Sequence, residues 1–169
     1  MKSKQTGLTL IELMVTLAVA IILVAVGMPL FTGIAANNRA TTQVNSLMAG
    51  ILLARSEATK RGETVTICPV DDPASINPPA CGGNGDWVNG WTVFFDDGSV
   101  IGEHIRIWEA LDGNPVIDTD STGIQFDSRG AADAAADFEL TLPETTGTAA
   151  RCISVSAAGQ ARAFRGACP

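Results

Sequence analysis

The sequence predicts an α+β fold in which one long N-terminal helix is packed under an antiparallel β-sheet domain. The first observation is a run of 24 residues without a charge, from position 13 to position 36. This run exceeds the ~18 apolar residues that indicate a membrane-spanning helix. The second is a change of hydrophobic pattern after residue 62, from helical spacing to short alternating segments separated by turn residues. Alternation with frequent Gly, Pro and Asp is typical of antiparallel strands.

We expect residues 8–61 to form one continuous helix, whose first half lies in the membrane. Beyond residue 37 the pattern becomes amphipathic, and cations followed by glycine at 60–62 form a helix stop signal. At ~1.5 Å per residue the helix would be roughly 80 Å long. Pro29 lies inside it, where we expect a kink or local opening. The residues predicted to face the domain are Ala40, Val44, Leu47, Met48, Ile51, Leu52, Ala54 and Ala58.

Short strands are expected to follow the helix, after which residues 69–90 read as a long loop. An antiparallel sheet with one apolar face needs a covering element, and the amphipathic half of the helix supplies it. The predicted strands are 64–67, 91–95, 105–108, 123–126, 138–142, 152–156 and 161–164.

Composition argues against several classes of function. The net charge of −7 opposes general affinity for nucleic acid, because phosphate binding needs clustered cations. Tyrosine is absent, His104 is the single histidine, and the Gly-x-Ser-x-Gly nucleophile pattern does not occur. We therefore predict that the protein is not an enzyme, uses no cofactor, and carries His104 as an ordinary surface residue.

Four cysteines fall into two sequence-local pairs, Cys68 with Cys81 and Cys152 with Cys168. If the apolar segment exports the rest of the chain, the compartment is oxidising and disulfides are expected. Three pairings are available, of which we favour the local one, and free buried thiols are the alternative. Each local bridge would contribute about 3 kcal/mol on the loop-entropy model. A zinc site is disfavoured, because there is no Cys-x-x-Cys spacing and one histidine.

Residues 118–123 begin like a calcium-binding loop, with acids at alternate positions. The third ligand position is occupied by Thr122 and the closing acidic position by Arg129, and neither supplies the required carboxylate. We interpret the segment as a solvated turn and predict no metal site.

The N-terminus differs from a secretory signal, because the apolar run follows the small residue Gly7 instead of preceding it. Cleavage after Gly7 would leave the apolar helix on the product and create an α-amine on Leu8, four residues before Glu12. A carboxylate in hydrocarbon costs about 2.5–3.5 kcal/mol, so Glu12 is expected to have a charged partner. Lys2 and Lys4 favour a cytoplasmic N-terminus.

The sequence Gly7-Leu8-Thr9-Leu10-Ile11-Glu12 resembles the class III signal of type IV pilins and type II secretion pseudopilins. The resemblance implies that a prepilin peptidase cleaves after Gly7 and methylates Leu8, which stands where the family usually has phenylalanine. It also implies that Glu12 pairs with the terminal amine of a neighbouring subunit during assembly. Residues 1–7 would be the leader peptide, 8–36 the transmembrane and assembly half of the helix, and 37–169 a periplasmic globular domain.

Later segments resemble the GspH/FimT family, which contains type II secretion pseudopilin H and the type IV minor pilins FimT and FimU. The matching segments are 53–62, 90–96, 126–130, and 151–156 with Gly159. The resemblance implies a single-pass inner-membrane protein that joins other pilins or pseudopilins in a filament, and so takes part in protein secretion or pilus biogenesis. The sequence does not separate a type II secretion pseudopilus from a type IV pilus.

The C-terminus supports an alternative function, DNA binding in natural transformation. The last 25 residues have a side-chain charge of +3, from Arg151, Arg162 and Arg165. DNA-capturing FimT-like pilins carry Gly-Arg-x-Arg here, and this chain has Gln160 in place of the first arginine. Arg162 and Arg165 are the candidate DNA-binding residues, and few phosphate contacts imply weak, salt-sensitive binding. A solvated strand, or an edge that pairs with other subunits, would explain the same residues.

Overall fold

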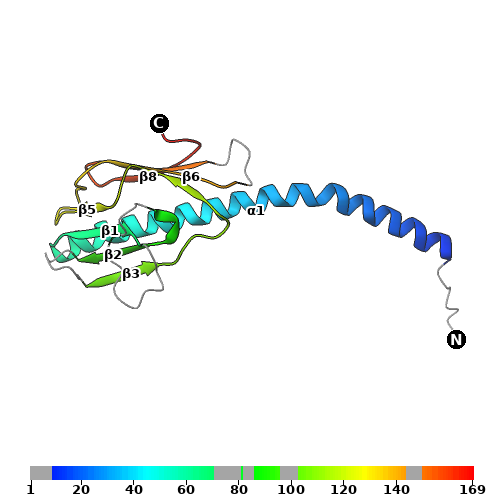
Figure 1. Ribbon diagram of the computed structural model, residues 1–169, viewed down its shortest axis with the longest axis horizontal. Helices are drawn as coiled ribbons and strands as arrows, with labels where there is room; N and C mark the ends of the chain where they lie inside the picture. The colour runs from blue at the N-terminus through cyan, green and yellow to red at the C-terminus, as the bar shows by residue number, and fades with distance from the viewer. Residues whose placement is uncertain (1–8, 71–80, 82–85, 96–102, 144–149) are drawn as a thin grey trace, which may run out of the picture. The chain divides into compact units, whose positions relative to one another are not determined.

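The computed structural model describes residues 9–70, 81, 86–95, 103–143 and 150–169 (Figure 1). Its single α-helix, α1 (Leu10–Arg61), contains 52 residues. The predicted helix is thus confirmed over this range, and Leu8 lies outside the described residues. The helix continues through Pro29, so the expected local opening is not present there. Proline removes one backbone donor, and the bonds of the surrounding residues keep the segment helical.

The chain divides into two compact units, residues 1–35 and residues 36–169, and α1 contributes to both. In the first unit, Leu10–Gly27 has a mean hydropathy of 2.7 and no buried residue. It is the one described helix that is long and apolar enough to cross a membrane. Eighteen residues extend about 27 Å, close to the ~30 Å hydrocarbon core of a bilayer.

The second unit contains two four-stranded antiparallel sheets, ordered β3-β2-β1-β5 and β4-β6-β7-β8. All seven predicted strands are confirmed, with ends shifted by at most two residues. The elements after α1 are β1 (Val65–Pro69), the 3-10 helix η1 (Trp87–Asn89), β2 (Trp91–Phe95), β3 (His104–Trp108), β4 (Val116–Asp118), β5 (Ile124–Phe126), β6 (Ala136–Thr141), β7 (Arg151–Val155) and β8 (Ala161–Arg165).

Two features of the sheets differ from the sequence prediction. Strand β4 was not expected, because three residues directly after Pro115 are too few to show an alternating pattern. The strands also form two sheets instead of one. The chain enters the second sheet at β4, returns to the first at β5, and enters the second again at β6. The predicted loop 69–90 contains η1 and a bridge between Val70 and Cys81, while 71–80 and 82–85 lie outside the described residues.

One hydrophobic cluster joins the C-terminal half of α1 to both sheets. Figure 1 shows this part of the helix between β6 and β8 on one side and β1, β2 and β3 on the other. The fully buried helix residues recur at intervals of four and three, namely Ala40, Val44, Leu47, Ile51, Ala54 and Ala58. The prediction for Leu52 is wrong, since 47% of its surface is exposed, whereas Met48 is half-buried and packs against the cluster as expected. Met48 and Leu52 each follow a buried residue, Leu47 and Ile51, so they lie at the margin of the buried face.

Candidate functional site

The apolar helix begins with a side-chain cap. Thr9 precedes Leu10, and its hydroxyl accepts a hydrogen bond from the backbone N–H of Glu12, with 3.3 Å between Oγ1 and N. Thr9 and Glu12 have the Ser/Thr-x-x-Glu spacing of a capping box. The cap begins the helix at Leu10 and places the Glu12 carboxylate in the first turn, where the helix dipole favours negative charge. This role of Thr9 was not predicted, although the Thr-x-x-Glu spacing indicates it.

The processing residues Gly7 and Leu8 lie outside the described residues. Beyond Glu12, large apolar side chains point outward on all sides of α1, including Ile21, Ile22 and Leu23, each at least 60% exposed. A helix that is hydrophobic all round requires lipid or other helices as its surroundings. The N-terminal unit therefore combines a capped acidic first turn with an uncovered apolar surface.

Both disulfides join sequence-local cysteines. Cys68 is bonded to Cys81 with the Cα atoms 5.3 Å apart, and Cys152 to Cys168 with the Cα atoms 5.1 Å apart. Both separations lie within the usual ~4.4–6.8 Å. No cysteine is left as a free thiol. The second bridge ties the C-terminal tail onto β7, next to the β7–β8 hairpin that carries the C-terminal arginines.

The C-terminal arginines do not form one patch. In the β7–β8 register, Arg165 lies opposite Arg151 and Arg162 lies opposite Ser154. Because side chains alternate along a strand, Arg162 and Arg165, three residues apart, point to opposite faces of the sheet. The candidate pair is thus separated, and Arg165 is instead brought beside Arg151. The sequence indicated three nearby arginines, but only the strand register shows which two share a face.

An acidic cavity of about 560 Å³ opens beside β4 and β6 of this sheet. Asp118 and Glu139 lie directly opposite each other in the β4–β6 register. The backbone N–H of Cys168 donates to Glu139 Oε2 over 3.2 Å, so the C-terminal tail forms part of the wall. The carboxylate residues that line the cavity are Asp118, Asp120, Asp133, Asp137 and Glu139.

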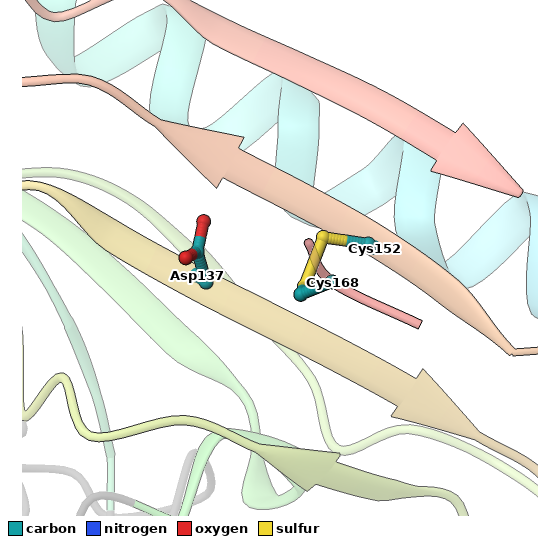
Figure 2. Close-up of side chains that lie close together, drawn as sticks. All are labelled: Asp137, Cys152 and Cys168. Carbon is teal, nitrogen blue, oxygen red and sulfur yellow. A yellow bond between two sulfur atoms is a disulfide. The ribbon is translucent and has the colours of Figure 1, made fainter. Parts of the chain in front are cut away.

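Figure 2 shows the one described group with metal-ligand spacing, in which Asp137 on β6 lies beside the Cys152–Cys168 bridge. The two sulfur atoms are bonded to each other, so they offer no thiolate to zinc. In the turn that resembled a calcium loop, the hydroxyls are used internally. Thr119 Oγ1 accepts from the N–H of Ser121 over 3.1 Å, and Ser121 donates to the Gly123 carbonyl over 2.8 Å.

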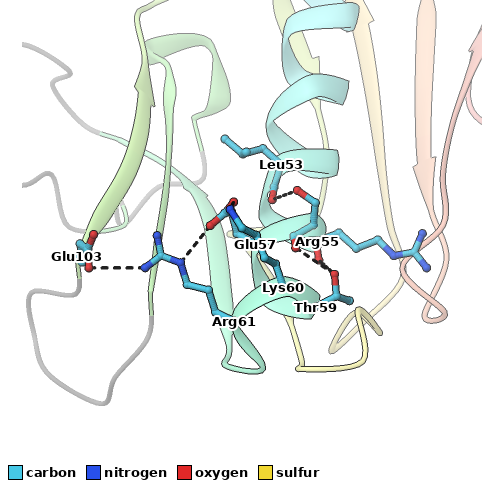
Figure 3. A network of polar contacts seen from close by, with 8 residues as sticks. Leu53, Arg55, Glu57, Thr59, Lys60, Arg61 and Glu103 are labelled. Atoms are coloured by element: carbon cyan, nitrogen blue, oxygen red, sulfur yellow. Dashed lines mark hydrogen bonds and ion pairs between the residues drawn. The ribbon is translucent and has the colours of Figure 1, made fainter.

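The last turns of α1 carry a network of polar contacts, one of which reaches Glu103 before β3 (Figure 3). The Glu57 carboxylate accepts from Lys60 Nζ over 3.3 Å and from Arg61 Nε over 3.1 Å. Arg61 Nη1 also lies 3.7 Å from Glu103 Oε2. Desolvation by itself would raise the pKa of Glu57, but the hydrogen bonds and charges of Lys60 and Arg61 outweigh it and hold the pKa below its usual value.

Arg55 connects two turns that are far apart in sequence. Its Nε donates to the carbonyl of Gly130 over 3.1 Å, and its Nη2 to the carbonyl of Ala158 over 3.4 Å. The first turn leads from β5 toward β6, and the second is the β7–β8 hairpin. Gly159 has a φ of +73° and lies against the Gly130 carbonyl, where a Cβ would overlap the oxygen. Arg55 therefore positions the hairpin, a role that the family resemblance of residues 53–62 did not specify.

The turn after β5 is organised by Asp127. Its carboxylate accepts from the backbone N–H groups of Ala131 and Arg129, each over 2.9 Å, and from the Arg129 guanidinium over 2.9 and 3.0 Å. The Ala131 N–H, followed by the Arg129 side chain, holds the pKa of Asp127 below its ordinary value. This turn presents the Gly130 carbonyl to Arg55.

His104 is not the plain surface residue that the sequence indicated. It is half-buried on β3, and its Nδ1 lies 2.8 Å from the Thr92 hydroxyl. Burial lowers the pKa of His104, so the neutral imidazole is favoured. Thr92 is completely buried, so this hydroxyl is inaccessible to a substrate and the pair does not act as a nucleophile and its base.

Two family models match the chain. The model described as "Type II transport protein GspH" matches residues 43–159, a little over two thirds of the chain. The model described as "Prokaryotic N-terminal methylation motif" matches residues 2–28. No curated protein shows significant sequence similarity to the chain.

Two crystal forms of the type IV minor pilin FimU from Pseudomonas aeruginosa (strain PAO1) have a similar fold. The first is 20% identical, with a TM-score of 0.57 over 79% of this chain and 92% of that one. The second is also 20% identical, with a TM-score of 0.53 over 74% of this chain and 90% of that one. At 20% identity, this similarity shows a shared fold and nothing further.

Proposed function

Because the chain belongs to the GspH family of type II transport proteins, we propose that its mature form is a structural subunit of a type II secretion pseudopilus or a type IV pilus. The family and the pilin fold make it a minor pilin or pseudopilin, a membrane-anchored protein with a globular domain. We further propose that the chain is cleaved after Gly7 and joins a filament through its N-terminal helix. It takes part in protein secretion or pilus biogenesis.

The observation that carries the proposal is the capped first turn of α1. Thr9 fixes the start of the helix, and Glu12 places a carboxylate at the edge of a wholly uncovered apolar surface. Such a charge is unfavourable in hydrocarbon unless it meets a cation. Cleavage after Gly7 creates that cation, the amine of Leu8, on each subunit. Glu12 of an incoming subunit then pairs with the Leu8 amine of a neighbour, and the helices associate along their apolar surfaces.

The proposed boundaries follow from this assembly step. Residues 1–7 are the leader removed by a prepilin peptidase, which also methylates Leu8. Residues 8–36 remain in the inner membrane until assembly and afterwards in the filament core. Residues 37–169 form the periplasmic domain, stabilised by two disulfides as suits an oxidising compartment. The partners are other pilins or pseudopilins of the same filament.

The protein is proposed to have no catalytic activity of its own. Thr92, the described hydroxyl closest to His104, is buried, and the sulfur atoms beside Asp137 are bonded to each other. DNA binding is not favoured as the primary function, because Arg162 and Arg165 point to opposite faces of the sheet. A phosphate backbone that follows one face would meet only one of them.

The test separates the charge of Glu12 from its place in the helix cap. Glu12→Gln keeps a residue type that suits the third position of a capping box but removes the negative charge. We expect normal membrane insertion and cleavage of this variant, with incorporation into filaments reduced at least about tenfold, as for loss of an ion pair in a low-dielectric setting. Sheared filaments and membranes are compared by immunoblotting for the mature and precursor forms.

Two further variants complete the test. Gly7→Ala should leave the uncleaved precursor in the membrane, and Glu57→Gln, which changes an acid of the globular domain, should assemble normally. Assembly of Glu12→Gln at the wild-type level would disprove the pairing of Glu12 with an amine. Normal cleavage of Gly7→Ala would disprove the processing site.

A further inference from the structure

Strand β8 ends the β4-β6-β7-β8 sheet with an uncovered edge. In the described part of the chain, it pairs with β7 and with no other strand. Four of its five residues are exposed, and Phe164 leaves 43% of its surface in solvent. Unpaired edge strands are sites at which a further strand can be added.

The hydrogen-bond pattern shows which residues face outward. The N–H of Ser156 donates to the carbonyl of Gln160 over 2.9 Å, and the N–H of Gly166 donates to the carbonyl of Ala150 over 2.8 Å. Ladder bonds in an antiparallel pair recur at every second residue. The even-numbered residues of β8 therefore bond to β7, and the odd-numbered ones direct their N–H and C=O groups away from the sheet.

The positive charge on this edge takes part in no ion pair with another described residue. Arg151 and Arg165 lie directly opposite each other, and like charges in this arrangement are destabilising. Residues 150–169 contain no acidic side chain, and none of the ion pairs among described residues involves Arg151, Arg162 or Arg165. Within the described residues these three cations are thus available to acidic groups of another molecule.

The two faces of β8 restrict the form of that molecule. Arg162 lies on the face of the Cys152–Cys168 bridge, whereas Arg165 and Arg151 lie on the face that continues into the core through Ile153. An extended peptide also alternates its side chains between faces. A strand added to β8 would therefore reach both groups with two acidic residues three positions apart.

We propose that β8 is a docking edge for an extended acidic segment of a neighbouring pilin subunit, which adds as a further strand with one carboxylate for Arg162 and another for the Arg151–Arg165 pair. Backbone hydrogen bonds provide the affinity of such strand addition, and the side chains provide its specificity. The proposal rests on the proposed function, because filament assembly brings neighbouring domains together at high effective concentration.

A second copy of this chain does not match the edge through its own acidic strand. In and after β4, Asp118 and Asp120 are two positions apart. In a continuing strand that spacing places both carboxylates on one face. Glu109 and Asp112 are three positions apart, but the N–H of Leu111 between them already donates to the Val88 carbonyl, so this segment is not a free strand. We therefore take the partner to be a different subunit of the filament, whose exposed strand carries acidic residues at the three-residue spacing.

The experiment uses the full chain in cells that assemble the filament. A photoreactive amino acid replaces Ala163, at the centre of the outward-facing edge, or Val116, exposed on the opposite edge of the same sheet. The Ala163 position is expected to crosslink to another pilin subunit, through a peptide that mass spectrometry identifies as an acidic strand. The Val116 position is expected to give no crosslink to that peptide.

Charge reversal tests the contribution of the arginines. Arg165→Glu and Arg162→Glu should each reduce the Ala163 crosslink about tenfold, because like charges across an interface are strongly unfavourable. Arg106→Glu, which changes an exposed arginine on β3 in the other sheet, should leave the crosslink unchanged. The proposal would be overturned by equal crosslinking of all variants or by the absence of any crosslink in assembled filaments. It would also be overturned by a crosslink to nucleic acid or to a second copy of this chain.

The same samples distinguish the two levels of failure. If the chain is cleaved and present in filaments but Ala163 makes no crosslink to an acidic strand, this inference fails and the proposed function stands. In that case the arginines serve only to prevent unwanted edge pairing. If the chain is absent from filaments, both the proposed function and this inference are wrong.

Discussion

The two halves of α1 are equally helical but have opposite surroundings. Between Leu10 and Gly27 no residue is buried, although the mean hydropathy of this segment is 2.7. Between Ala36 and Ala58 the residues at intervals of four and three are almost completely covered by the two sheets. Hydrophobicity alone therefore does not tell which helical surface has a partner within its own chain. The first half is more apolar, and its proposed partners are a membrane and other subunits.

The difference lies in the spacing and size of the apolar residues. The C-terminal half limits its apolar residues to one face and includes small ones at the contact, such as Ala54 and Gly50. A Cβ on Gly50 would come within 2.7 Å of the Trp91 ring, so the helix and β2 are packed closely there. The N-terminal half carries large apolar residues on every face, as suits an environment that is apolar all round.

The strongest test of this comparison makes the same substitution in each half. Ile51 is completely buried and Ile21 is 60% exposed. Ile51→Ala should lower the free energy of unfolding of the globular domain by about 2–5 kcal/mol, because it removes buried methyl groups and leaves a cavity. Ile21→Ala should change it by less than about 0.5 kcal/mol. Urea unfolding of the full chain in detergent micelles, followed by fluorescence of the buried tryptophans, measures both values.

The comparison would be wrong if Ile21→Ala destabilised the domain as much as Ile51→Ala does. Ile21→Asn should instead affect membrane insertion, measured by the fraction of the chain in the membrane pellet. A change in insertion without a change in domain stability would sharpen the division of α1 into two roles.

A second test concerns the turns that Arg55 holds against the helix. Gly159 and Gly62 have nearly the same backbone conformation, with φ of +73° and +72°. In Gly62→Ala nothing lies within 4 Å of the added Cβ, so the only cost is the strain of the left-handed backbone, about 1–2 kcal/mol of unfolding free energy. Gly159→Ala should cost about 1–3 kcal/mol more, because its Cβ overlaps the Gly130 carbonyl. Thermal unfolding compares the pair, and equal losses would contradict the proposed packing.

The smallest expected effect is a pH dependence of the domain. Hydrogen bonds from Ala131 and Arg129 lower the pKa of Asp127 in the folded state below its ordinary value of 3.8. A carboxylate with a lowered pKa contributes stability above its unfolded-state pKa, and this contribution is lost as the pH falls through the folded-state value. The wild type should thus be more stable than Asp127→Asn at pH 6, and the difference should shrink below pH ~4.

Arg129→Gln refines the pH test. The Ala131 N–H is the larger cause of the lowered pKa, so this variant should keep part of the pH dependence that Asp127→Asn loses. Unfolding midpoints in urea at several pH values provide the measurement. A difference between wild type and Asp127→Asn that is constant from pH 6 to pH 3 would refute the assignment to Asp127.

Much of the fold could be predicted because its signals are local. The end of α1 was marked by Lys60, Arg61 and Gly62, and the seven predicted strands are alternating segments bounded by turn residues. Strand β4 escaped prediction because its three residues are paired by β6, which lies some twenty residues further along the chain. The division into two sheets also depends on long-range pairing, and no local pattern encodes it.

The sequence by itself determined the leader-like N-terminus, the membrane-length apolar segment, the amphipathic continuation of the helix and the family. These depend on residue type and spacing within one segment. Only the tertiary structure decided that Leu52 is exposed, that Arg55 holds two turns, and that Arg165 shares a face with Arg151 and not with Arg162. The physical reason is that strand pairing and close packing join residues that are remote in sequence, and a shift of one residue in register reverses the face on which a side chain lies.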